Sequence, residues 1–318
     1  RRGAGPDPRV SVSDEAGPSL AVDGGQTGIK VRAGGGVTFA RTYPGVRTNA
    51  GVLPQLADAV LAAAREAGPF ATVAVGTTGL TEAEDDPGRL LALCAAAGLR
   101  RVVLAHDSIT SYLGALGPER GVVVAAGTGV VTLAVGADRM ARVDGWGNIM
   151  GDAGSGYWIG REALDAVMRA FDGRGPGTLL SGVVGARFPR LDQAYIELQT
   201  DPDRVRLVAS FAAAVSDLAA SDGVAGRICA RAGEELALSA ATAARVAGLD
   251  RPVVCLVGSV FRSNAVRSSC LDALSRLAPG FRDVPPRGNG LDGAEALLTL
   301  PPDHPLASKL SVAEATGR

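Results

Sequence analysis

The feature of this sequence that most constrains its fold is an order of elements that occurs twice. Three short β-like segments separated by glycine turns open each of two stretches of the chain, and helical patterns alternating with further strands follow each set. The first set is expected at residues 19–22, 29–32 and 37–42, and the second at residues 121–126, 130–135 and 139–143. The repeat predicts an α/β protein of two units, each with a βββ-then-α/β pattern.

The elements after each set continue the same plan. Helices are expected at 52–67, at 89–97 and just after Asp107, with strands at 72–75 and 101–105 between them. In the second unit, helical patterns occupy 154–248 and a buried strand at 253–257 ends at Gly258. Because such alternation favours parallel strands, each three-stranded set should continue into a parallel part of its sheet, with helical insertions in the second unit.

The length of 318 residues fits two domains better than one. We expect an N-terminal domain at 19–118, a C-terminal domain at 119–290, and at 291–318 a helix that packs back on the N-terminal domain, followed by a tail. Residues 1–18 are rich in Gly, Pro, Asp and Ser and poor in apolar side chains, which is typical of a mobile arm.

Charge and cysteine content narrow the class of protein. The formal net charge of −1 gives no reason to expect binding to nucleic acid or to an anionic membrane. No run of about 20 apolar residues is present, and the first residues lack the apolar segment of a secretion signal. The four cysteines are far apart and form no CxxC pair, so they are expected to be reduced core thiols. The sequence therefore predicts a cytoplasmic protein with no nucleic-acid or membrane partner.

Two glycine-rich turns stand at matched positions in the two units. Asp23-Gly24-Gly25-Gln26-Thr27 follows the first strand of the first unit, and Gly127-Thr128-Gly129 follows the first strand of the second. Small residues let successive backbone N–H groups approach phosphate oxygens. Asp23, at the strand end, could hold Mg²⁺ through water. Either turn alone could be an ordinary hairpin, but the matched pair predicts a polyphosphate gripped from two sides.

Asp107 lies where an apolar strand ends and a helix begins. A carboxylate there can cap the helix. It can also face the crevice where open α/β sheets bind ligands, and accept a hydroxyl proton as a general base. From the residues alone, both interpretations stay open. Its neighbour His106 is expected to be a packing or positioning residue.

A third signal is the glycine-rich segment 145–156, which contains Trp146 and Asp152. So many glycines imply that the backbone passes very close to another group. A carboxylate beside an aromatic ring suits a polar ligand with an apolar face, such as a sugar. Near the end of the chain, Gly258 follows a buried strand and precedes a helix, where the backbone could admit the flat face of a purine.

Taken together, these segments resemble the N-acetylglucosamine kinases of the BadF/BadG/BcrA/BcrD ATPase family, within the actin–hexokinase–Hsp70 superfamily. The resemblance covers about residues 20–298, and its most specific block runs from Gly145 to Glu162. It implies two ribonuclease H-like domains of the actin/hexokinase type, with a βββαβαβα pattern and a central cleft. It also implies ATP and Mg²⁺ as cofactors and a homodimer.

The resemblance assigns roles to single positions. Asp107 matches the catalytic base, and Asp23 matches the metal position. Sugar contacts fall on Asn49, Gly145, Trp146, Gly147 and Asp152, and ATP contacts fall on Gly24, Gly25, Thr27, Thr128, Gly129, Ala209, Gly258 and Ser263. Two positions depart from the family pattern, because Gln26 replaces a glycine and Val130 replaces a serine. These departures bear on substrate and rate rather than on reaction class.

The activity that the resemblance implies is transfer of the ATP γ-phosphate to the C6 hydroxyl of an amino sugar, N-acetylglucosamine first. Glucosamine or another hexosamine is the alternative acceptor. An ATPase that activates a reductase is an alternative of another class, but the scattered cysteines offer no convincing pair to bridge a cluster. A non-catalytic sugar sensor is a further alternative, although residues 1–18 are too short and too polar for a helix-turn-helix.

Overall fold

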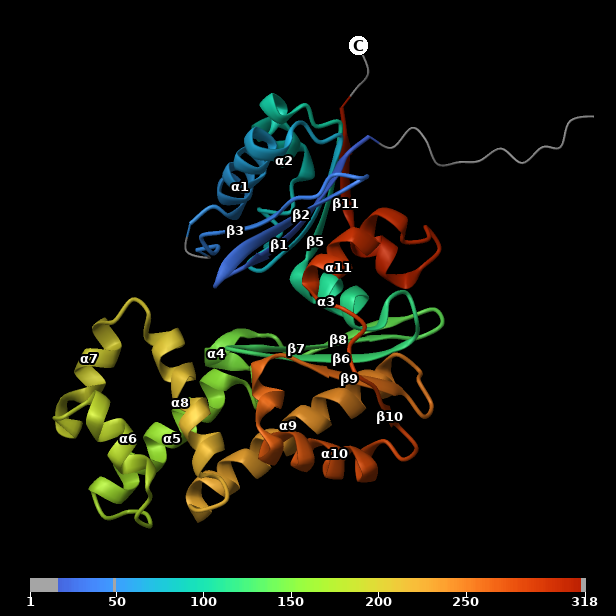
Figure 1. The fold of residues 1–318 in the computed structure, drawn as a ribbon. Coiled ribbons are helices and arrows are strands. Elements are labelled where there is room, and N and C mark those ends of the chain that lie inside the picture. Colours follow the sequence, from blue (N-terminus) through green and yellow to red (C-terminus); the bar gives the residue numbers. More distant parts are fainter. Residues whose placement is uncertain (1–16, 48–49, 316–318) are drawn as a thin grey trace, which may run out of the picture. The chain divides into compact units, whose positions relative to one another are not determined.

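The computed structural model describes residues 17–47 and 50–315 and divides the chain into two compact units (Figure 1). Unit 1 consists of the residues up to Thr110, together with Gly290–Leu300 and the residues from Lys309 onward. Unit 2 consists of Ser111–Asn289 and Pro301–Ser308. The chain therefore passes between the two units several times, so neither unit is a single stretch of sequence.

Unit 1 is built on a six-stranded sheet with the order β11-β5-β4-β1-β2-β3. Its strands are β1 (Ser19–Gly25), β2 (Gly28–Gly34), β3 (Ala40–Tyr43), β4 (Thr72–Thr77), β5 (Arg101–His106) and β11 (Ser311–Glu314). Strands β1, β2 and β3 form an antiparallel meander, β4 and β5 extend it in parallel with β1, and β11 pairs antiparallel with β5. The carboxyl ends of β1, β4 and β5 consequently meet at one edge of the sheet.

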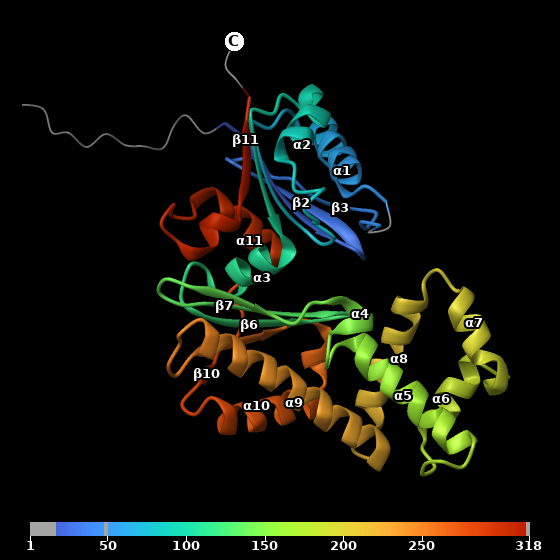
Figure 2. The same ribbon diagram turned by 180° about the vertical axis from the view of Figure 1, so that it is seen from behind.

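Helices cover both faces of this sheet, with α1 and α2 on one face and α11 on the other (Figures 1 and 2). They are α1 (Val52–Ala67), α2 (Pro87–Leu93) and α11 (Gly290–Ala296), and α3 (Asp107–Leu116) starts in this unit. Leu53, Leu56 and Val60 recur at helical spacing on α1 and are fully buried, which places the apolar stripe of that helix against the sheet.

Unit 2 repeats the plan of unit 1. Its sheet has the order β10-β9-β6-β7-β8 and consists of β6 (Gly121–Ala126), β7 (Val130–Val135), β8 (Met140–Val143), β9 (Val253–Val257) and β10 (Arg282–Asp283). Strands β6, β7 and β8 form the antiparallel meander, and β9 and β10 extend it in parallel with β6. The order matches β5-β4-β1-β2-β3 of unit 1 strand for strand, which confirms the predicted repeat.

Helices make up most of the remainder of unit 2. They are α4 (Gly147–Met150), α5 (Gly156–Phe171), α6 (Leu180–Arg187), α7 (Ala194–Thr200), α8 (Arg204–Leu218), α9 (Gly223–Val246) and α10 (Asn264–Leu277). Helix α9 packs against both the sheet and α10. Gly233 allows the close approach to α10, because a Cβ there would lie 2.6 Å from the Cys270 nitrogen. Gly160 of α5 does the same against the carbonyl of Val208 on α8.

Several elements differ from those predicted. Strand β3 begins at Ala40 rather than at residue 37, and the helix predicted at 89–97 divides into α2 and a 3₁₀ turn at Ala95–Ala97. That turn ends at Gly98, whose φ of 74° is left-handed and stops a helix. Strands β10 and β11 were not predicted at all. Both are short edge strands, and an edge strand is defined by the neighbour with which it pairs rather than by its own pattern.

Two predicted features fall wholly or largely outside the described residues. The mobile arm predicted at 1–18 is described only at Gly17 and Pro18, and the Pro18 carbonyl accepts a hydrogen bond from the Ala71 amide at 2.7 Å. Asn49, a predicted sugar contact, lies outside the described residues.

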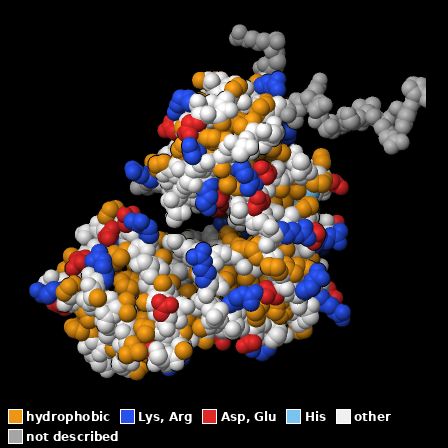
Figure 3. Space-filling view, in the orientation of Figure 1, with side chains coloured by type: hydrophobic (Ala, Val, Ile, Leu, Met, Phe, Trp, Pro, Cys, Tyr) orange, Lys and Arg blue, Asp and Glu red, His pale blue; other side chains and the backbone are white. Residues whose placement is uncertain are grey.

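Charged side chains of both signs are interspersed over the face shown in Figure 3, in line with the net charge of −1. Within the described part of the chain, no single helix combines the length and apolar character needed to cross a membrane; α8 and α9 meet the threshold only as a pair, bent by 112° at their junction.

Asp222 joins the helical insertion of unit 2 to α9. It is 6% exposed and caps α9 by accepting hydrogen bonds from the amides of Val224 and Ala225. The same carboxylate accepts hydrogen bonds from the Thr178 hydroxyl and the Leu179 amide ahead of α6. Burial alone would raise the pKa of this carboxyl, but the four hydrogen bonds together hold the pKa below its usual value.

Because the folded-state pKa of Asp222 is depressed, its stabilisation should be complete above the unfolded-state pKa of about 4 and fade as the pH falls through the folded value. We expect Asp222→Ala to cost about 1–3 kcal/mol of folding free energy at neutral pH, by loss of the cap and of the bonds to the preceding loop. Thermal unfolding of both proteins between pH 7 and pH 3 tests this. The difference in Tm should shrink on acidification, and a difference independent of pH would contradict the assignment.

Candidate functional site

In unit 1, the predicted phosphate turn is a tight hairpin between β1 and β2. Gly25 pairs with Gly28, which leaves Gln26 and Thr27 exposed at the tip. Gly24 is buried, and a Cβ there would lie 2.7 Å from the Thr77 hydroxyl at the end of β4. The turn is therefore held against the neighbouring parallel strand, and its tip is open.

A second glycine supports this turn from the other side. The Val46 amide donates to the Gly25 carbonyl at 2.9 Å. A Cβ at Gly45 would lie 2.0 Å from the Gln26 carbonyl oxygen, so no other residue fits there without moving the turn. The sequence gives no sign of this supporting role, because nothing local to Gly45 shows which backbone the glycine meets.

Asp23 and Asp107 lie toward the carboxyl ends of two parallel strands of the same sheet, β1 and β5, which β4 separates. Asp23 lies near the end of β1, with its carboxylate 22% exposed and 3.7 Å from the Lys30 ammonium. Burial raises the pKa of the Asp23 carboxyl, Lys30 lowers it, and the Asp107 charge raises it again. The two carboxylates are therefore close enough to interact electrostatically.

Asp107 follows β5 and is the first residue of α3, with its side chain 34% exposed. Its Oδ1 lies 2.9 Å from Nδ1 of His106, and the same ring nitrogen is 2.9 Å from the Ser108 hydroxyl. The His106 ring thus holds the Asp107 carboxylate from one side. This contact fits the positioning role expected for His106 and leaves part of the carboxylate open.

In unit 2, the start of α5 supports the second predicted phosphate turn. The amide of Gly156 donates to the Gly127 carbonyl at 2.8 Å, and the amide of Tyr157 donates to the Thr128 carbonyl at 3.0 Å. Ser155 caps the same helix through the Trp158 amide and is fully buried. The helix therefore fixes the carbonyls of Gly127 and Thr128 in the turn.

Asp152 packs directly on this turn. It is 7% exposed, and a Cβ at Gly129 would lie 2.7 Å from its Oδ2. Its Oδ1 accepts a hydrogen bond from the Gly147 amide at 3.2 Å. Burial and the charge of Asp144 raise the pKa of the Asp152 carboxyl, while hydrogen bonds from the amides of Gly147 and Val130 lower it. The structure thus brings the predicted sugar carboxylate and the predicted phosphate turn into contact within one unit.

Trp146 stands on the loop beside Asp152 and is 60% exposed. The Arg142 guanidinium lies over the indole at 5.3 Å and donates to the Gly145 carbonyl at 2.6 Å. Ile149 and Met150, on the short helix α4, are still more exposed at 92% and 82%. This loop presents an apolar surface of the kind that the face of a sugar ring can cover.

The residues predicted to bind adenosine lie around the same turn. Gly258 has a φ of 106°, and a Cβ there would lie 2.2 Å from the carbonyl oxygen of Ala126, the residue before the turn. Ala209 on α8 meets α5 at Gly156. Ser263 is 8% exposed, and its hydroxyl caps α10 through the Val266 amide. Gly258 and Ala209 therefore adjoin the turn, while the Ser263 hydroxyl already serves a helix.

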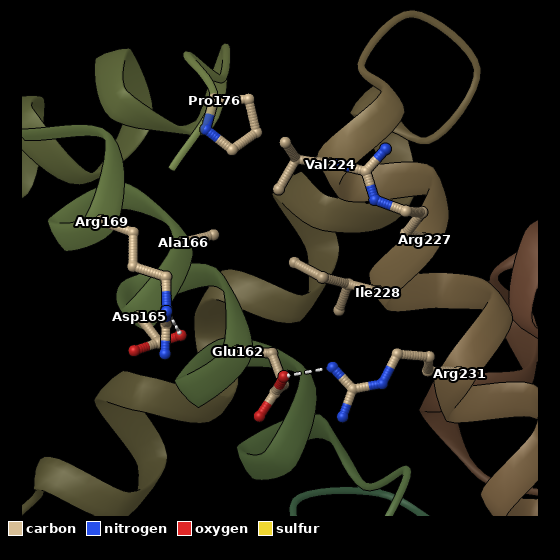
Figure 4. Close-up of a pocket in the computed structure, with 9 residues that line it drawn as sticks. All are labelled: Glu162, Asp165, Ala166, Arg169, Pro176, Val224, Arg227, Ile228 and Arg231. Carbon is tan, nitrogen blue, oxygen red and sulfur yellow. Dashed lines mark hydrogen bonds and ion pairs between the residues drawn. The ribbon is translucent and has the colours of Figure 1, made fainter. Parts of the chain in front are cut away.

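A separate hollow of about 220 Å³ lies between α5 and α9 (Figure 4). Its apolar floor includes Ala166 and Ile228. Charges at its rim are largely paired, because Glu162 binds Arg231 at 2.8 Å and Asp165 binds Arg169 at 2.6 Å. None of the predicted site residues lines it.

The residues at the end of β1 fit Mg²⁺ bound through water. Among the described residues, no group of three or more His, Cys, Asp or Glu side chains could hold a metal ion. Mg²⁺ does not need one, because it keeps much of its water and often uses one or two carboxylates. Asp23 offers such a carboxylate, and the Asp107 carboxylate lies close enough to it to act on its pKa.

Two mixed sheets that share the same order of five strands, each with a glycine turn after its first strand, define a two-domain protein of the actin/hexokinase type. The structural comparison agrees. A solved structure from Chromobacterium violaceum, of a protein proposed to be an N-acetylglucosamine kinase, superposes with a TM-score of 0.72 over 89% of this chain and 98% of that chain, at 24% identity. A ROK hexokinase of Thermus thermophilus superposes with a TM-score of 0.55 over 87% and 96%, at 18% identity.

The family follows from the sequence comparison. The model of the BadF/BadG/BcrA/BcrD ATPase family matches residues 20–290, so the chain belongs to that family. The N-acetylmuramic acid/N-acetylglucosamine kinase of Clostridium acetobutylicum is 27% identical over 196 residues, which are 58% of this chain and 61% of that protein. The N-acetyl-D-glucosamine kinase of Dictyostelium discoideum is 42% identical over 81 residues, 25% of each chain. The matched segments therefore span less than two thirds of these relatives.

The contact between Gly129 and Asp152 predicts different outcomes for two glycines of one turn. Gly129→Ala would place a methyl group 2.7 Å from the Asp152 carboxylate, whereas a Cβ at Gly127 meets nothing within 4 Å. We expect Gly129→Ala to cost about 1–3 kcal/mol of stability and Gly127→Ala to stay within about 0.5 kcal/mol. Thermal unfolding without ligand measures both, and equal Tm values for the two variants would refute the contact.

Proposed function

We propose that this chain is an ATP-dependent sugar kinase that phosphorylates the C6 hydroxyl of an amino sugar, N-acetylglucosamine first. The observation that carries the proposal is the pair of partly exposed carboxylates, Asp23 and Asp107, at the same edge of the sheet of unit 1 and close enough to interact electrostatically. They occur in a family whose curated relatives are named as kinases of N-acetylated sugars.

Unit 1 would supply the group that activates the acceptor. Asp107 would orient the sugar hydroxyl and take its proton as the new oxygen–phosphorus bond forms. Contact with His106 limits the rotation of that carboxylate. Backbone amides of the turn at Gly24, Gly25 and Thr27 would hold phosphate oxygens. Asp23 would hold Mg²⁺, which when bound offsets the charge of the phosphates.

Unit 2 would supply the sugar pocket and the second phosphate turn. Thr128 and Gly129 would face the phosphates. Asp152 would accept hydrogen bonds from hydroxyl groups of the sugar, and Trp146 would cover the apolar face of the ring. Gly145 and Gly147 would bring the loop backbone close to the sugar, and Asn49 of unit 1 is a further proposed contact. Gly258 and Ala209, beside the turn, would adjoin the adenosine, as would Ser263, the residue that caps α10.

One relative bears a name that includes both N-acetylmuramic acid and N-acetylglucosamine, so the acceptor range is the open part of this proposal. Glucosamine or another hexosamine stays the alternative acceptor.

Mg²⁺ dependence, a homodimer and a cytoplasmic location remain predictions. Omission of magnesium from the assay and light scattering on the purified protein test the first two.

An ATPase that activates a reductase is the second candidate, because the family name covers ATPases broadly. Such an activator would need accessible cysteines to hold an iron–sulfur cluster. All four cysteines here are buried, and burial raises the pKa of Cys94 and Cys255 to about 11 and of Cys270 to about 12. Buried thiols favour the kinase over the activator, and they also leave no exposed thiol for a cluster shared between two chains.

A coupled assay of ADP release over a panel of sugars tests the proposed function. The panel is glucose, glucosamine, N-acetylglucosamine, N-acetylmannosamine and N-acetylmuramic acid, with ATP and magnesium. We expect the highest kcat/KM for N-acetylglucosamine. ADP release that no sugar stimulates would contradict a sugar kinase and support the ATPase alternative.

Asp107→Ala should abolish phosphorylation without abolishing nucleotide binding. Loss of a general base costs about 10²–10⁴-fold in rate, so we expect a fall of that size in kcat with ATP affinity within about twofold. Calorimetric titration with ATP and the coupled assay separate the two effects. Substantial remaining turnover would remove Asp107 from the role of base.

A further inference from the structure

The loop that carries Asp152 is closed by another carboxylate, Asp144, to which no role has been assigned so far. Asp144 follows β8 and has a φ of 59°, a left-handed backbone conformation that is uncommon for a residue with a side chain. Asp152 has the same φ of 59°. Strained residues of this kind persist only where the surrounding structure holds them, and they concentrate at functional sites.

The side chain of Asp144 provides that hold. Its Oδ1 accepts hydrogen bonds from the amides of Gly145 and Asp152, both at 2.7 Å. Its Oδ2 accepts a hydrogen bond from the Ala153 amide at 3.0 Å. One carboxylate thus ties the first residue of the loop to its far end. The consecutive amides of Asp152 and Ala153 form an anion-binding nest that the chain fills with its own carboxylate.

Space for this contact depends on a glycine. A Cβ at Gly151 would lie 2.5 Å from Oδ1 of Asp144 and 3.0 Å from the Cβ of Trp146. The loop backbone at Gly151 therefore passes directly over the Asp144 carboxylate and the Trp146 side chain. Any movement of Asp144 would be passed to both Trp146 and Asp152.

We propose that Asp144 is a positioning residue that fixes Asp152 and the loop 145–153 for sugar binding. This proposal rests on the proposed function, because it assigns Asp144 to the sugar side of that reaction. Asp144 itself need not touch the sugar, since all three of its hydrogen bonds go to the loop backbone. It acts by holding the backbone of Asp152 in the left-handed conformation from which the Asp152 carboxylate reaches the Gly147 amide.

Electrostatics give Asp144 a second effect that a purely structural residue would not have. The charged groups that face Asp152 are Asp144 from the loop and Arg142 from β8. Burial raises the pKa of Asp152 most, the Asp144 charge raises it further, and Arg142 lowers it. Because Asp152 accepts hydrogen bonds best when ionised, sugar binding should weaken as the pH falls through its pKa. A plot of kcat/KM for the sugar against pH should therefore fall on its acid side, which is called the acid limb below. Removal of the Asp144 charge should lower the pKa of Asp152 and so move this acid limb to lower pH.

Two variants separate position from charge. Asp144→Asn removes the charge but keeps one oxygen that can accept the bonds from Gly145 and Asp152. Asp144→Gly removes the charge and every side-chain hydrogen bond, while glycine tolerates the left-handed φ.

Both variants should move the acid limb of kcat/KM for the sugar by a similar amount. The sugar KM should rise roughly tenfold in Asp144→Asn and more in Asp144→Gly, since hydrogen bonds to a charged group are lost. The ATP KM should stay within about twofold.

The matched control is Asp138→Asn, which removes one exposed carboxylate from the loop between β7 and β8 of the same unit. It should leave the sugar KM and the acid limb unchanged. Steady-state kinetics against pH, with Tm measured for every variant, complete the experiment. A lower Tm with an unchanged sugar KM and acid limb would show that Asp144 serves the fold alone, and would overturn the proposal. Equal rises in the KM of sugar and ATP would overturn it too.

Failure of the proposed function gives a different result. If the unmodified protein phosphorylates no sugar of the panel, the sugar kinase and the role of Asp144 both fall. If the unmodified protein is active and the two Asp144 variants match it, only the role of Asp144 falls.

Discussion

Close contact between main-chain segments at the two glycine turns is the constraint on which both units depend. In unit 1, Gly45 lies against the carbonyl of Gln26, and in unit 2, Gly258 lies against the carbonyl of Ala126. A side chain at either position would overlap backbone atoms that other hydrogen bonds hold in place. The glycines therefore do more than permit a tight hairpin, because they let a later part of the chain fix each turn. A turn fixed in this way presents amides with little freedom left to lose on binding phosphate.

The two units share a strand order but support their turns differently. In unit 1, the support is the segment after β3, through the bond from Val46 to Gly25. In unit 2, the support is the first turn of α5, whose amides meet the carbonyls of Gly127 and Thr128. That difference follows from the insertion between β8 and α9, which gives unit 2 room for the loop that carries Asp152. The unit with the insertion therefore holds all of the proposed sugar contacts except Asn49, whereas the shorter unit holds the proposed base.

Much of the fold could be predicted from local pattern. The bounds of α1, β6 and β7 agree with the expected ranges, because each has strong apolar periodicity and a glycine or turn at its ends. Strand β11 could not be predicted, since its four residues become a strand only by pairing with β5. For the site, motif position identified Asp107 and Asp152 as candidates. It missed Asp144, because an aspartate before a glycine reads as an ordinary turn residue until its three amide partners are known.

The sequence by itself determined the order of the elements, the two glycine turns and the identity of the carboxylates, because these depend on residue type and on spacing within a few positions. Tertiary structure alone decided which backbone each glycine meets and which charges act on each carboxylate. Asp107 acts on Asp23 because β1, β4 and β5 are parallel neighbours whose carboxyl ends coincide. Asp144 acts on Asp152 because a loop of glycines folds back on itself. Such contacts are made across space, so no local pattern encodes them.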